Sequence, residues 1–445
     1  MLMPALGLML AATTAAPPEQ ALVLDIRAAS AADIDALKRH DGVHWWLEMG
    51  TRLVVGGEPA AIVGLGARGI SSDGAIALDR RDLALHAIGC DPDTVAPGRL
   101  LVQSGRWQLR LLEPGAALPA QEADDGIWRR VDGNTVLARQ ARLDLPAGIT
   151  PDPLIQPMVD RVDAPRWFAD LSQLAGWDRS SYGTTGLNAA RDWIGNRFAE
   201  LGLAVTTPGF TMPAAGGGSI TRQNVIGTWI GTTRPDEWII VGGHYDSRNA
   251  TGSSVANTPG AEDNASGCAG VIELARVLLP FKPKRSVLFM CYAGEEQGLY
   301  GSTRHVQALQ ASGDIGKVRS VVIMDMIGYS ADNQLDALYE SKAAYQSFLD
   351  RFAAAAAAYV PGLNVVLSTN PFGSDHMPYL NANKETVLAI DADYADYPHY
   401  HRSTDTPANM GVNAQAMGAA ILKTNAAVLA DLAGASDRIF ADVLQ

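Results

Sequence analysis

The chain has 445 residues, of which 47% are hydrophobic and 19% charged, and its formal net charge is −13. This composition is typical of a folded globular protein with room for two domains, and it excludes a disordered or fibrous chain. The acidic balance argues against nucleic acid as a partner, because phosphate binding requires a basic surface. No apolar run reaches the about 18 residues of a membrane-spanning helix, so we expect no stable membrane span. Nothing in the sequence indicates an oligomeric state.

The first 20 residues have the pattern of an export signal. An apolar stretch, residues 2–12, leads into small residues and two prolines, as in the core and cleavage region of a secretory signal peptide. The first basic residue is Arg27, so the usual positive start is missing, and the alternative is an apolar tail packed on the domain. We expect residues 1–20 to be a signal peptide and the protein to be exported, to the periplasm or outside the cell.

Residues 21–147 are expected to form a smaller, strand-rich α+β module. Residues 31–40 predict a helix, and short apolar runs, most of them flanked by Gly or Pro, predict strands at 23–26, 52–55, 100–103, 107–112 and 135–139. This stretch of sequence has no cluster of metal-ligating residues. Its role is expected to be that of a propeptide, a substrate cap or a docking surface.

A Pro-rich linker over 148–165 leads into the second part of the chain, residues 166–445. Helical and strand-like segments alternate in this second part. The alternation predicts an α/β fold, with a mixed, mostly parallel central sheet covered by helices on both faces.

Two segments of the second part place metal-ligating side chains at expected strand ends. His244 follows the apolar run 238–241, and Asp325 follows the apolar run 321–324. Open α/β sheets bind ligands at the carboxyl ends of their strands. Imidazole nitrogen and carboxylate oxygen are both ligands of zinc. The pattern therefore indicates a metal site at this edge of the sheet.

Further carboxylates extend this set toward two metal ions. Glu295 and Glu296 follow a third apolar run. Because neighbouring side chains point in different directions, one can bind metal while the other is a general base for a water held by the metal. A carboxylate can bridge two ions, and Asp263, in a loop before a predicted helix, is the candidate. Asp246 is expected to accept the second ring N–H of His244 and fix its tautomer.

With these motifs the chain resembles metallopeptidase family 28, the dizinc aminopeptidases related to bacterial leucyl aminopeptidase. The resemblance covers roughly residues 160–435. Six motifs follow in the same order, namely His-Tyr-Asp-Ser at 244–247, Gly-Ala-Glu-Asp-Asn-Ala-Ser-Gly at 260–267, Gly-Glu-Glu-Gln-Gly-Leu-Tyr-Gly-Ser at 294–302, Met-Asp-Met-Ile-Gly-Tyr at 324–329, Ser-Asp-His at 374–376, and His401.

The resemblance implies two Zn²⁺ per chain and an exported aminopeptidase that hydrolyses the N-terminal bond of peptide substrates with a metal-bridging water. It also implies a role for seven residues: the ligands His244 and Asp325 for one zinc, the ligands Glu296 and His401 for the other, the bridge Asp263, the general base Glu295, and Asp246 as the residue that orients His244.

The chain departs from the family pattern at one position. Bacterial leucyl aminopeptidase has a tyrosine shortly before Ser-Asp-His that stabilises the tetrahedral intermediate, whereas residues 370–373 contain none. Tyr394, Tyr397 and Tyr400 are the alternatives. Three further polar residues are candidates for direct function: Asp375, which alternatively caps a helix, His376 and His399. Four apolar residues predict either core or a pocket for a hydrophobic first residue of the substrate: Met326, Ile327, Phe372 and Met377.

Other functions remain open on the same fold. A glutaminyl cyclase-like transferase would share several ligands but use one zinc, and carboxypeptidase or dipeptidase action would use the same chemistry. A non-enzymatic peptidase-like binding domain is disfavoured, because the full ligand set and the base are present. The three cysteines, Cys90, Cys268 and Cys291, fit no disulfide framework and are interpreted as small core residues.

Overall fold

The computed structural model describes residues 19–66, 74–88, 96–120, 126–145, 149–251 and 254–434. Residues 1–18 of the expected signal peptide lie outside the described residues, and Gln20 already begins strand β1 (Gln20–Asp25). Cys90 also lies outside them. Within the described ranges, no helix is long and apolar enough to cross a membrane.

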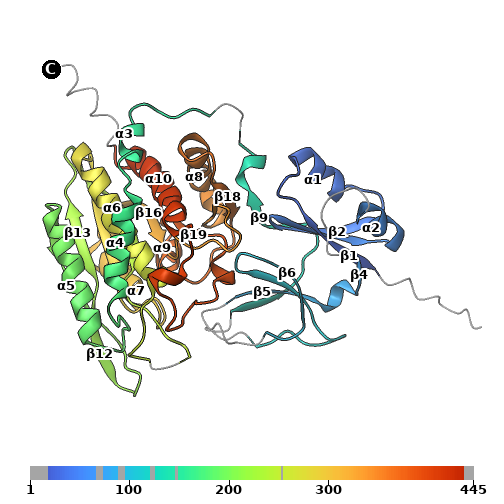
Figure 1. Ribbon diagram of the computed structural model, residues 1–445, viewed down its shortest axis with the longest axis horizontal. Helices are drawn as coiled ribbons and strands as arrows, with labels where there is room; N and C mark the ends of the chain where they lie inside the picture. The colour runs from blue at the N-terminus through green and yellow to red at the C-terminus, as the bar shows by residue number, and fades with distance from the viewer. Residues whose placement is uncertain are drawn as a thin grey trace, which may run out of the picture.

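A sheet of thirteen strands runs through the described chain (Figure 1). Its first eight strands, in spatial order, are β10 (Ala204–Thr206), β13 (Val225–Trp229), β15 (Arg285–Tyr292), β14 (Arg234–His244), β16 (Val318–Met324), β19 (Glu385–Asp391), β17 (Asp336–Glu340) and β18 (Asn364–Ser368). The sheet continues into the N-terminal module with β9 (Thr135–Gln140), β2 (Val43–Gly50), β3 (Arg52–Gly57), β1 and β4 (Ile76–Ala77).

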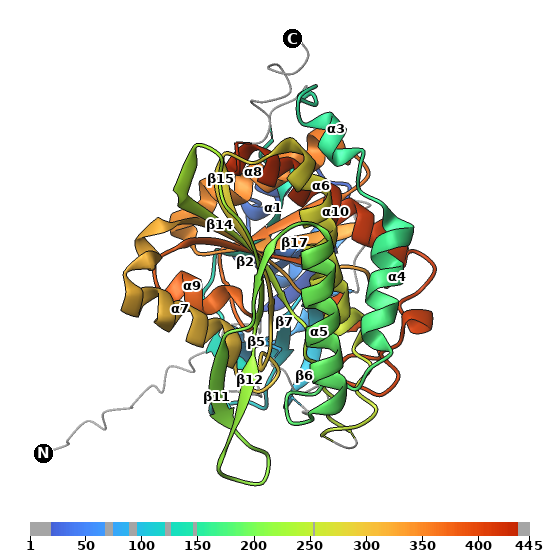
Figure 2. The same ribbon diagram turned by 90° about the vertical axis from the view of Figure 1, so that its left-hand side faces the viewer.

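The centre of the second part is parallel, as the sequence predicts. Strand β14 pairs in parallel with β15 and β16, and β16 pairs in parallel with β19, so the carboxyl ends of these four strands lie at one edge. Helices cover both faces (Figure 2). One face carries α4 (Ala164–Ala175), α5 (Thr185–Glu200), α6 (Gly267–Leu278), α8 (Gln346–Tyr359) and α10 (Ala414–Leu432), and the other carries α7 (Tyr300–Ser312) and α9 (His376–Asn381).

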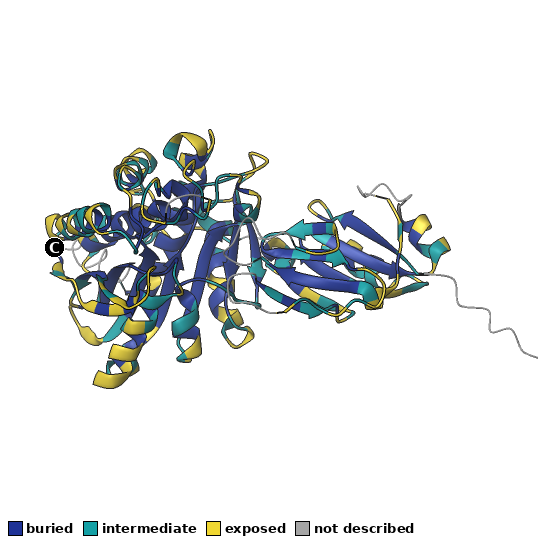
Figure 3. Ribbon diagram, turned by 90° about the horizontal axis from the view of Figure 1, so that it is seen from below, coloured by how far each residue is buried: buried dark blue, intermediate teal, exposed yellow. Residues whose placement is uncertain are grey.

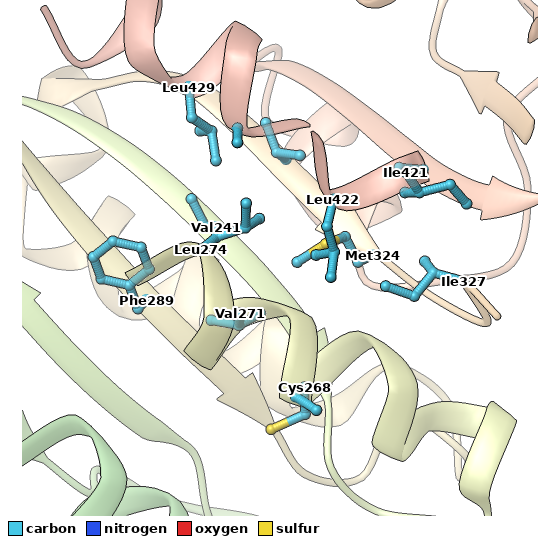
Figure 4. Close-up of a cluster of buried hydrophobic side chains, with 14 of the residues drawn as sticks. Val241, Cys268, Val271, Leu274, Phe289, Met324, Ile327, Ile421, Leu422 and Leu429 are labelled. Carbon is cyan, nitrogen blue, oxygen red and sulfur yellow. The ribbon is translucent and has the colours of Figure 1, made fainter. Parts of the chain in front are cut away.

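The core follows the two-residue repeat of the central strands, whose side chains point alternately to opposite faces. Ile239 and Val241 of β14 pack under α6 and α10, whereas Ile240 between them packs under α7 and α9. Figure 4 shows part of the first layer, where Leu274 of α6 and Leu422 of α10 meet the sheet. Strands buried on both faces in this way become continuous apolar runs, which is why the sequence reveals them.

The N-terminal module is part of the same sheet (Figure 3). β9 pairs antiparallel with β18, so backbone hydrogen bonds cross the expected domain boundary. Helices α1 (Ala31–Lys38) and α2 (Pro59–Gly66) pack on one face of the module's strands. A second sheet packs on the other face, with β6 (Arg99–Ser104), β7 (Trp107–Leu111), β5 (Leu83–Ala87) and β8 (Ile127–Arg130).

Two smaller features complete the fold. The expected linker contains a short helix, α3 (Gln156–Val159), and the first residues of α4, both of which pack on the main core. Strands β11 (Gly209–Pro213) and β12 (Ser219–Gln223) form a separate hairpin. The domain boundaries themselves stay a prediction.

Candidate metal centre

Six of the seven predicted site residues are brought together at the carboxyl ends of β14, β15 and β16, and the seventh, His401, reaches them from the loop after β19. His244 is the last residue of β14 and pairs with Tyr292, the last residue of β15. Asp325 directly follows β16, and its backbone N–H donates to the carbonyl of Ala389 on β19. The parallel pairing of the strands therefore sets the spacing of these side chains.

Asp263 lies between the two histidines. Its Oδ1 is 3.2 Å from His244 Nε2, and its Oδ2 is 2.9 Å from His401 Nε2. On the His244 side, Asp325 Oδ1 is 3.4 Å from the same Nε2. On the His401 side, Glu296 Oε2 is 3.0 Å from the ring. The arrangement has two halves that share one carboxylate, which is the grouping expected for the five ligands.

These atoms fit two metal ions by their spacing and chemistry. Ligands about 2.0 Å from one zinc in a tetrahedral site lie about 3.3 Å from each other, close to the separations found here. Two groups of three side chains have ligand atoms within 4.8 Å of one another, His244 with Asp263 and Glu296, and His244 with Glu295 and Asp325. Glu296 Oε1 and Asp325 Oδ1 are buried and accept no hydrogen bond within the described chain. Buried carboxylates need such partners or a cation.

The electrostatics of the site also favour cations. Burial raises the pKa of Glu295 well above its ordinary value, against the lowering effect of His244, and burial raises that of Glu296 as well. Burial lowers the pKa of His401, but Glu296 and Asp263 outweigh it and raise the pKa to about 10. Without metal, the carboxylates thus hold protons on the imidazoles, and bound cations would take the place of those protons.

Asp246 contacts His244 differently from the expectation. The nearest acceptor for His244 Nδ1 is the backbone carbonyl of Asp246, at 3.1 Å, and its carboxylate Oδ1 is 3.6 Å away. The carboxylate accepts instead from Ser181 Oγ at 2.9 Å and from the backbone N–H of Glu295 at 3.3 Å. Asp246 therefore fixes the tautomer of His244 through its carbonyl and the position of Glu295 through its side chain.

Sequence reasoning missed two residues that position Asp263. Buried Asp405 accepts the backbone N–H groups of Glu262 and Asp263 at 2.9 and 3.0 Å and the hydroxyl of Tyr397 at 2.8 Å. Asn264 donates to the carbonyl of Met324 at 3.0 Å, which ties the segment to the end of β16. Asp405 follows His401 by four residues, and that short spacing is the one signal that pointed to it.

A third missed residue is Arg179, which is fully buried. It donates to the carbonyls of Tyr245 and Gly260, at 2.7 Å each, and to those of Leu174 and Pro259, at 2.6 Å each. Arg179 thus joins the end of β14 to the segment that carries Asp263. Burial lowers its pKa to about 10, so it remains charged at neutral pH.

The other candidates separate into pocket and support. Tyr394, Tyr400, Met326 and Phe372 line a pocket together with Asp263, Glu295, Asp325 and His401. The ring of Tyr400 stacks on His401 with centroids 3.9 Å apart. Tyr397 is engaged with Asp405, and Ile327 belongs to the core. Met377 is not among the residues of the pocket.

The three further polar candidates have different surroundings. Asp375 precedes α9 without capping it through its side chain, and burial raises its pKa to about 7. His376 is buried, with its Nε2 3.6 Å from Glu340 Oε1. His399 Nδ1 lies 2.8 Å from Thr404 Oγ1, away from the metal ligands.

The interpretation of two cysteines was wrong. Cys268 and Cys291 form a disulfide, with Cα atoms 5.6 Å apart. Cys268 lies in the first turn of α6, after the Asp263 segment, and Cys291 lies near the end of β15, before the two glutamates. The bond could not be inferred from an odd number of cysteines in chain order, because the pairing arises from the packing of α6 on the sheet.

Comparison with known proteins agrees with the geometry. Residues 224–430 match the model of peptidase family M28. A probable zinc metalloprotease of Pyricularia oryzae is 35% identical over 199 residues, which are 41% of this chain and 39% of the relative. Another, of Leptosphaeria maculans, is 28% identical over 302 residues, 58% of this chain and 69% of the relative. The chain thus spans about two fifths of the first relative's length.

Solved structures share the fold. An aminopeptidase from Aneurinibacillus sp. strain AM-1 matches with a TM-score of 0.53 at 17% identity, over 63% of this chain and 96% of its own. LapB from Legionella pneumophila matches with a TM-score of 0.55 at 20% identity, over 79% of this chain and 99% of its own. Residues 166–445 are less than two thirds of the chain, so the LapB match has to extend further toward the N-terminus. Together with the family match, the clustered His, Asp and Glu side chains identify residues 224–430 as a zinc metallopeptidase domain of family M28.

Proposed function

We propose that the chain is an exported dizinc aminopeptidase that hydrolyses the N-terminal bond of peptides. The observation that carries the proposal is the position of Asp263, whose two oxygens face the two histidines at 3.2 and 2.9 Å. A carboxylate in this position is suited to bridge two ions. His244 and Asp325 would complete one zinc site, and Glu296 and His401 the other.

In the proposed reaction Glu295 moves the proton. Zinc, when bound, polarises the scissile carbonyl and lowers the pKa of water that it holds. Glu295 takes the proton from the attacking water and delivers it to the leaving amine. Burial, which raises the pKa of Glu295, makes the carboxylate a better proton acceptor. Its backbone is held by Asp246, so the side chain keeps its direction during turnover.

The pocket supports cleavage at a peptide's free end. Its walls contain apolar side chains, among them Met326, Phe372 and Ile390, beside the predicted metal ligands. The first side chain of a peptide would enter this pocket, and its α-amine would lie near the carboxylates of the site. Tyr394 and Tyr400 line the same pocket, so they are the candidates for stabilising the oxyanion, whereas Tyr397 serves Asp405.

Two observations support export. The first 20 residues have the composition of a signal peptide. The disulfide between Cys268 and Cys291 is of a kind that forms and persists in oxidising compartments outside the cytosol.

The test combines metal content with catalysis. Zinc per chain is measured by elemental analysis, and hydrolysis of leucyl-p-nitroanilide is measured for the wild type and for Glu295→Gln. The expected result is two zinc ions in both proteins, with activity lost in Glu295→Gln. Glu200→Gln, at a side chain that is 62% exposed, is the matched control and should keep full activity.

Two results would overturn the proposal. One zinc per chain with no amide hydrolysis would exclude the dizinc mechanism and favour a cyclase-like transferase. Hydrolysis of N-acetyl-leucyl-p-nitroanilide at the rate of the free amine would exclude an aminopeptidase, because the enzyme would then not require a free N-terminus.

A further inference from the structure

The pocket beside the metal centre is built from both parts of the chain. Ile88 and Arg106 of the N-terminal module line it together with Asp263, Glu295 and Asp325. More than 150 residues separate the module's contribution from the predicted ligands in sequence. The module therefore reaches the place where a substrate side chain would bind.

Ile88 and Arg106 are presented as a pair by the small sheet of the module. β5 and β7 pair antiparallel with Ala87 opposite Trp107, and the backbone N–H of Ile88 donates to the carbonyl of Arg106 at 2.8 Å. Both residues thus extend the strand ladder by one step toward the peptidase domain. A wall held by such hydrogen bonds has a defined position.

Arg106 fastens this pair to the peptidase domain. Its guanidinium is 4% exposed and lies 2.8 Å from Glu340 Oε1, at the end of β17. It also donates to the carbonyl of Phe372, and Glu340 accepts the backbone N–H of Phe372 at 3.2 Å. The guanidinium carbon is 5.6 and 5.7 Å from the ring centroids of Phe372 and Tyr394, two residues of the pocket wall.

The module also holds the loop that leads to a predicted metal ligand. Asn370 Nδ2 donates to the carbonyl of Leu137 on β9 at 3.0 Å, and Ser368 Oγ donates to the same carbonyl at 3.2 Å. Four residues after Asn370, Ser374 Oγ donates to Asp325 Oδ2 at 2.7 Å. One short loop thus connects β9 of the module with the metal centre.

We propose that the N-terminal module is a permanent wall of the substrate pocket and that Ile88 selects the first residue of the peptide by size. This inference rests on the proposed aminopeptidase function. A removable propeptide would lie across the site without being needed to shape it. Here the module shares the peptidase sheet, buries Arg106 against Glu340 and supplies pocket residues of its own, so the mature enzyme keeps it.

The test changes the size of Ile88 in the full-length, zinc-loaded protein. Ile88→Ala and Ile88→Phe are compared for kcat/KM on alanyl-, leucyl- and phenylalanyl-p-nitroanilide. We expect the phenylalanyl to alanyl ratio to rise about tenfold in Ile88→Ala and to fall about tenfold in Ile88→Phe, as for small volume changes in apolar pockets. Zinc content should not change.

A binding measurement separates this inference from the proposed function. Dissociation constants of phenylalanine hydroxamate and alanine hydroxamate, measured by calorimetry, should shift in the same two directions. Ile230→Ala, at a side chain that is 63% exposed, and Leu100→Ala, at an exposed position of the module, are the matched controls and should leave both ratios unchanged.

Each outcome decides one of the two proposals. Ratios that stay within about twofold in both Ile88 variants would overturn the inference while leaving the aminopeptidase intact. A wild type that hydrolyses none of the anilides would overturn the aminopeptidase, and the hydroxamate ratio would then decide the inference. A wild type that binds neither hydroxamate would overturn the inference as well.

Discussion

The two histidines of the metal centre are held in different ways. His244 is the last residue of β14, inside a parallel sheet buried on both faces, and its partner Asp325 directly follows β16. His401 belongs to a loop and has a left-handed backbone, with φ of 53°. A non-glycine residue in this conformation is strained and needs its surroundings to hold it there.

The surroundings of His401 provide that support. Its carbonyl accepts the N–H of Ala250, and Asp405, four residues later, binds the backbone of Glu262 and Asp263. The strand-borne half is therefore set by the sheet, and the loop-borne half by a buried carboxylate. We expect the first half to keep its geometry alone and the second to depend on Asp405.

Removal of metal acts on both halves and has the largest expected effect. Without metal, the pKa values of Glu295 and Glu296 lie above 4.5, and those of His244 and His401 above 6.5. Between each pair of values the folded protein binds more protons than the unfolded chain. The free energy of unfolding of the metal-free protein therefore falls as the pH rises.

Zinc binding has the opposite pH dependence, because its ligands must lose their protons. Chelated protein is expected to be inactive, and the gap in melting temperature between zinc-loaded and chelated protein should widen from about pH 5 to about pH 8. Differential scanning calorimetry across this range checks it. A gap that narrows would show that the carboxylates are not the groups neutralised by metal.

Removal of each histidine in turn tests the difference between the halves directly. His401→Ala should retain one zinc per chain on the strand-borne side, whereas His244→Ala should retain less than one. Both should lose more activity than the about 100-fold typical of losing an outer partner of a ligand. Elemental analysis after dialysis gives the metal content. Equal retention in the two variants would contradict the comparison.

Asp405→Asn weakens only the support of the loop-borne half. An amide oxygen and an NH₂ group cannot both accept the N–H groups of Glu262 and Asp263, so one hydrogen bond is lost. We expect about 10- to 100-fold weaker binding of one zinc, measured by competition with a chelator. Asp431→Asn, at a side chain that is 65% exposed, is the control, and an equal loss there would point to a general effect.

Ser374→Ala acts on the strand-borne half and has the smallest expected effect. It removes the hydrogen bond to Asp325 Oδ2, which is of the charge-assisted kind, so activity should fall about tenfold. Initial rates with leucyl-p-nitroanilide check this, with Ser312→Ala, an exposed serine at the end of α7, as control. A larger loss than in Asp405→Asn would reverse the comparison.

The sequence predicts the α/β class and the ligand grouping because both depend on local patterns. Buried strands become apolar runs, and His244, Asp325 and the two glutamates follow such runs. The support of the site was not predictable in the same way. Arg179 contacts Gly260 across 81 positions, and Asp246 uses a carbonyl where a carboxylate was expected.

The role of the module depends on contacts that no local pattern reveals. β9 pairs with β18 more than 220 residues later, and Arg106 meets Phe372 across 266 positions. Strands β2, β5 and β8 of the module were not predicted, because in each of them charged, histidine or tryptophan side chains interrupt the apolar pattern. The sequence indicated a strand-rich unit but could not indicate which edge it joins.

The long sheet ends in its two shortest strands, β10 with three residues and β4 with two. An exposed edge strand offers unpaired N–H and C=O groups to any other chain that can add a strand, and short edges offer few of them. By covering β18 with β9, the module replaces a five-residue edge with a two-residue edge. The same contact that completes the pocket therefore also protects the enzyme from edge-to-edge aggregation.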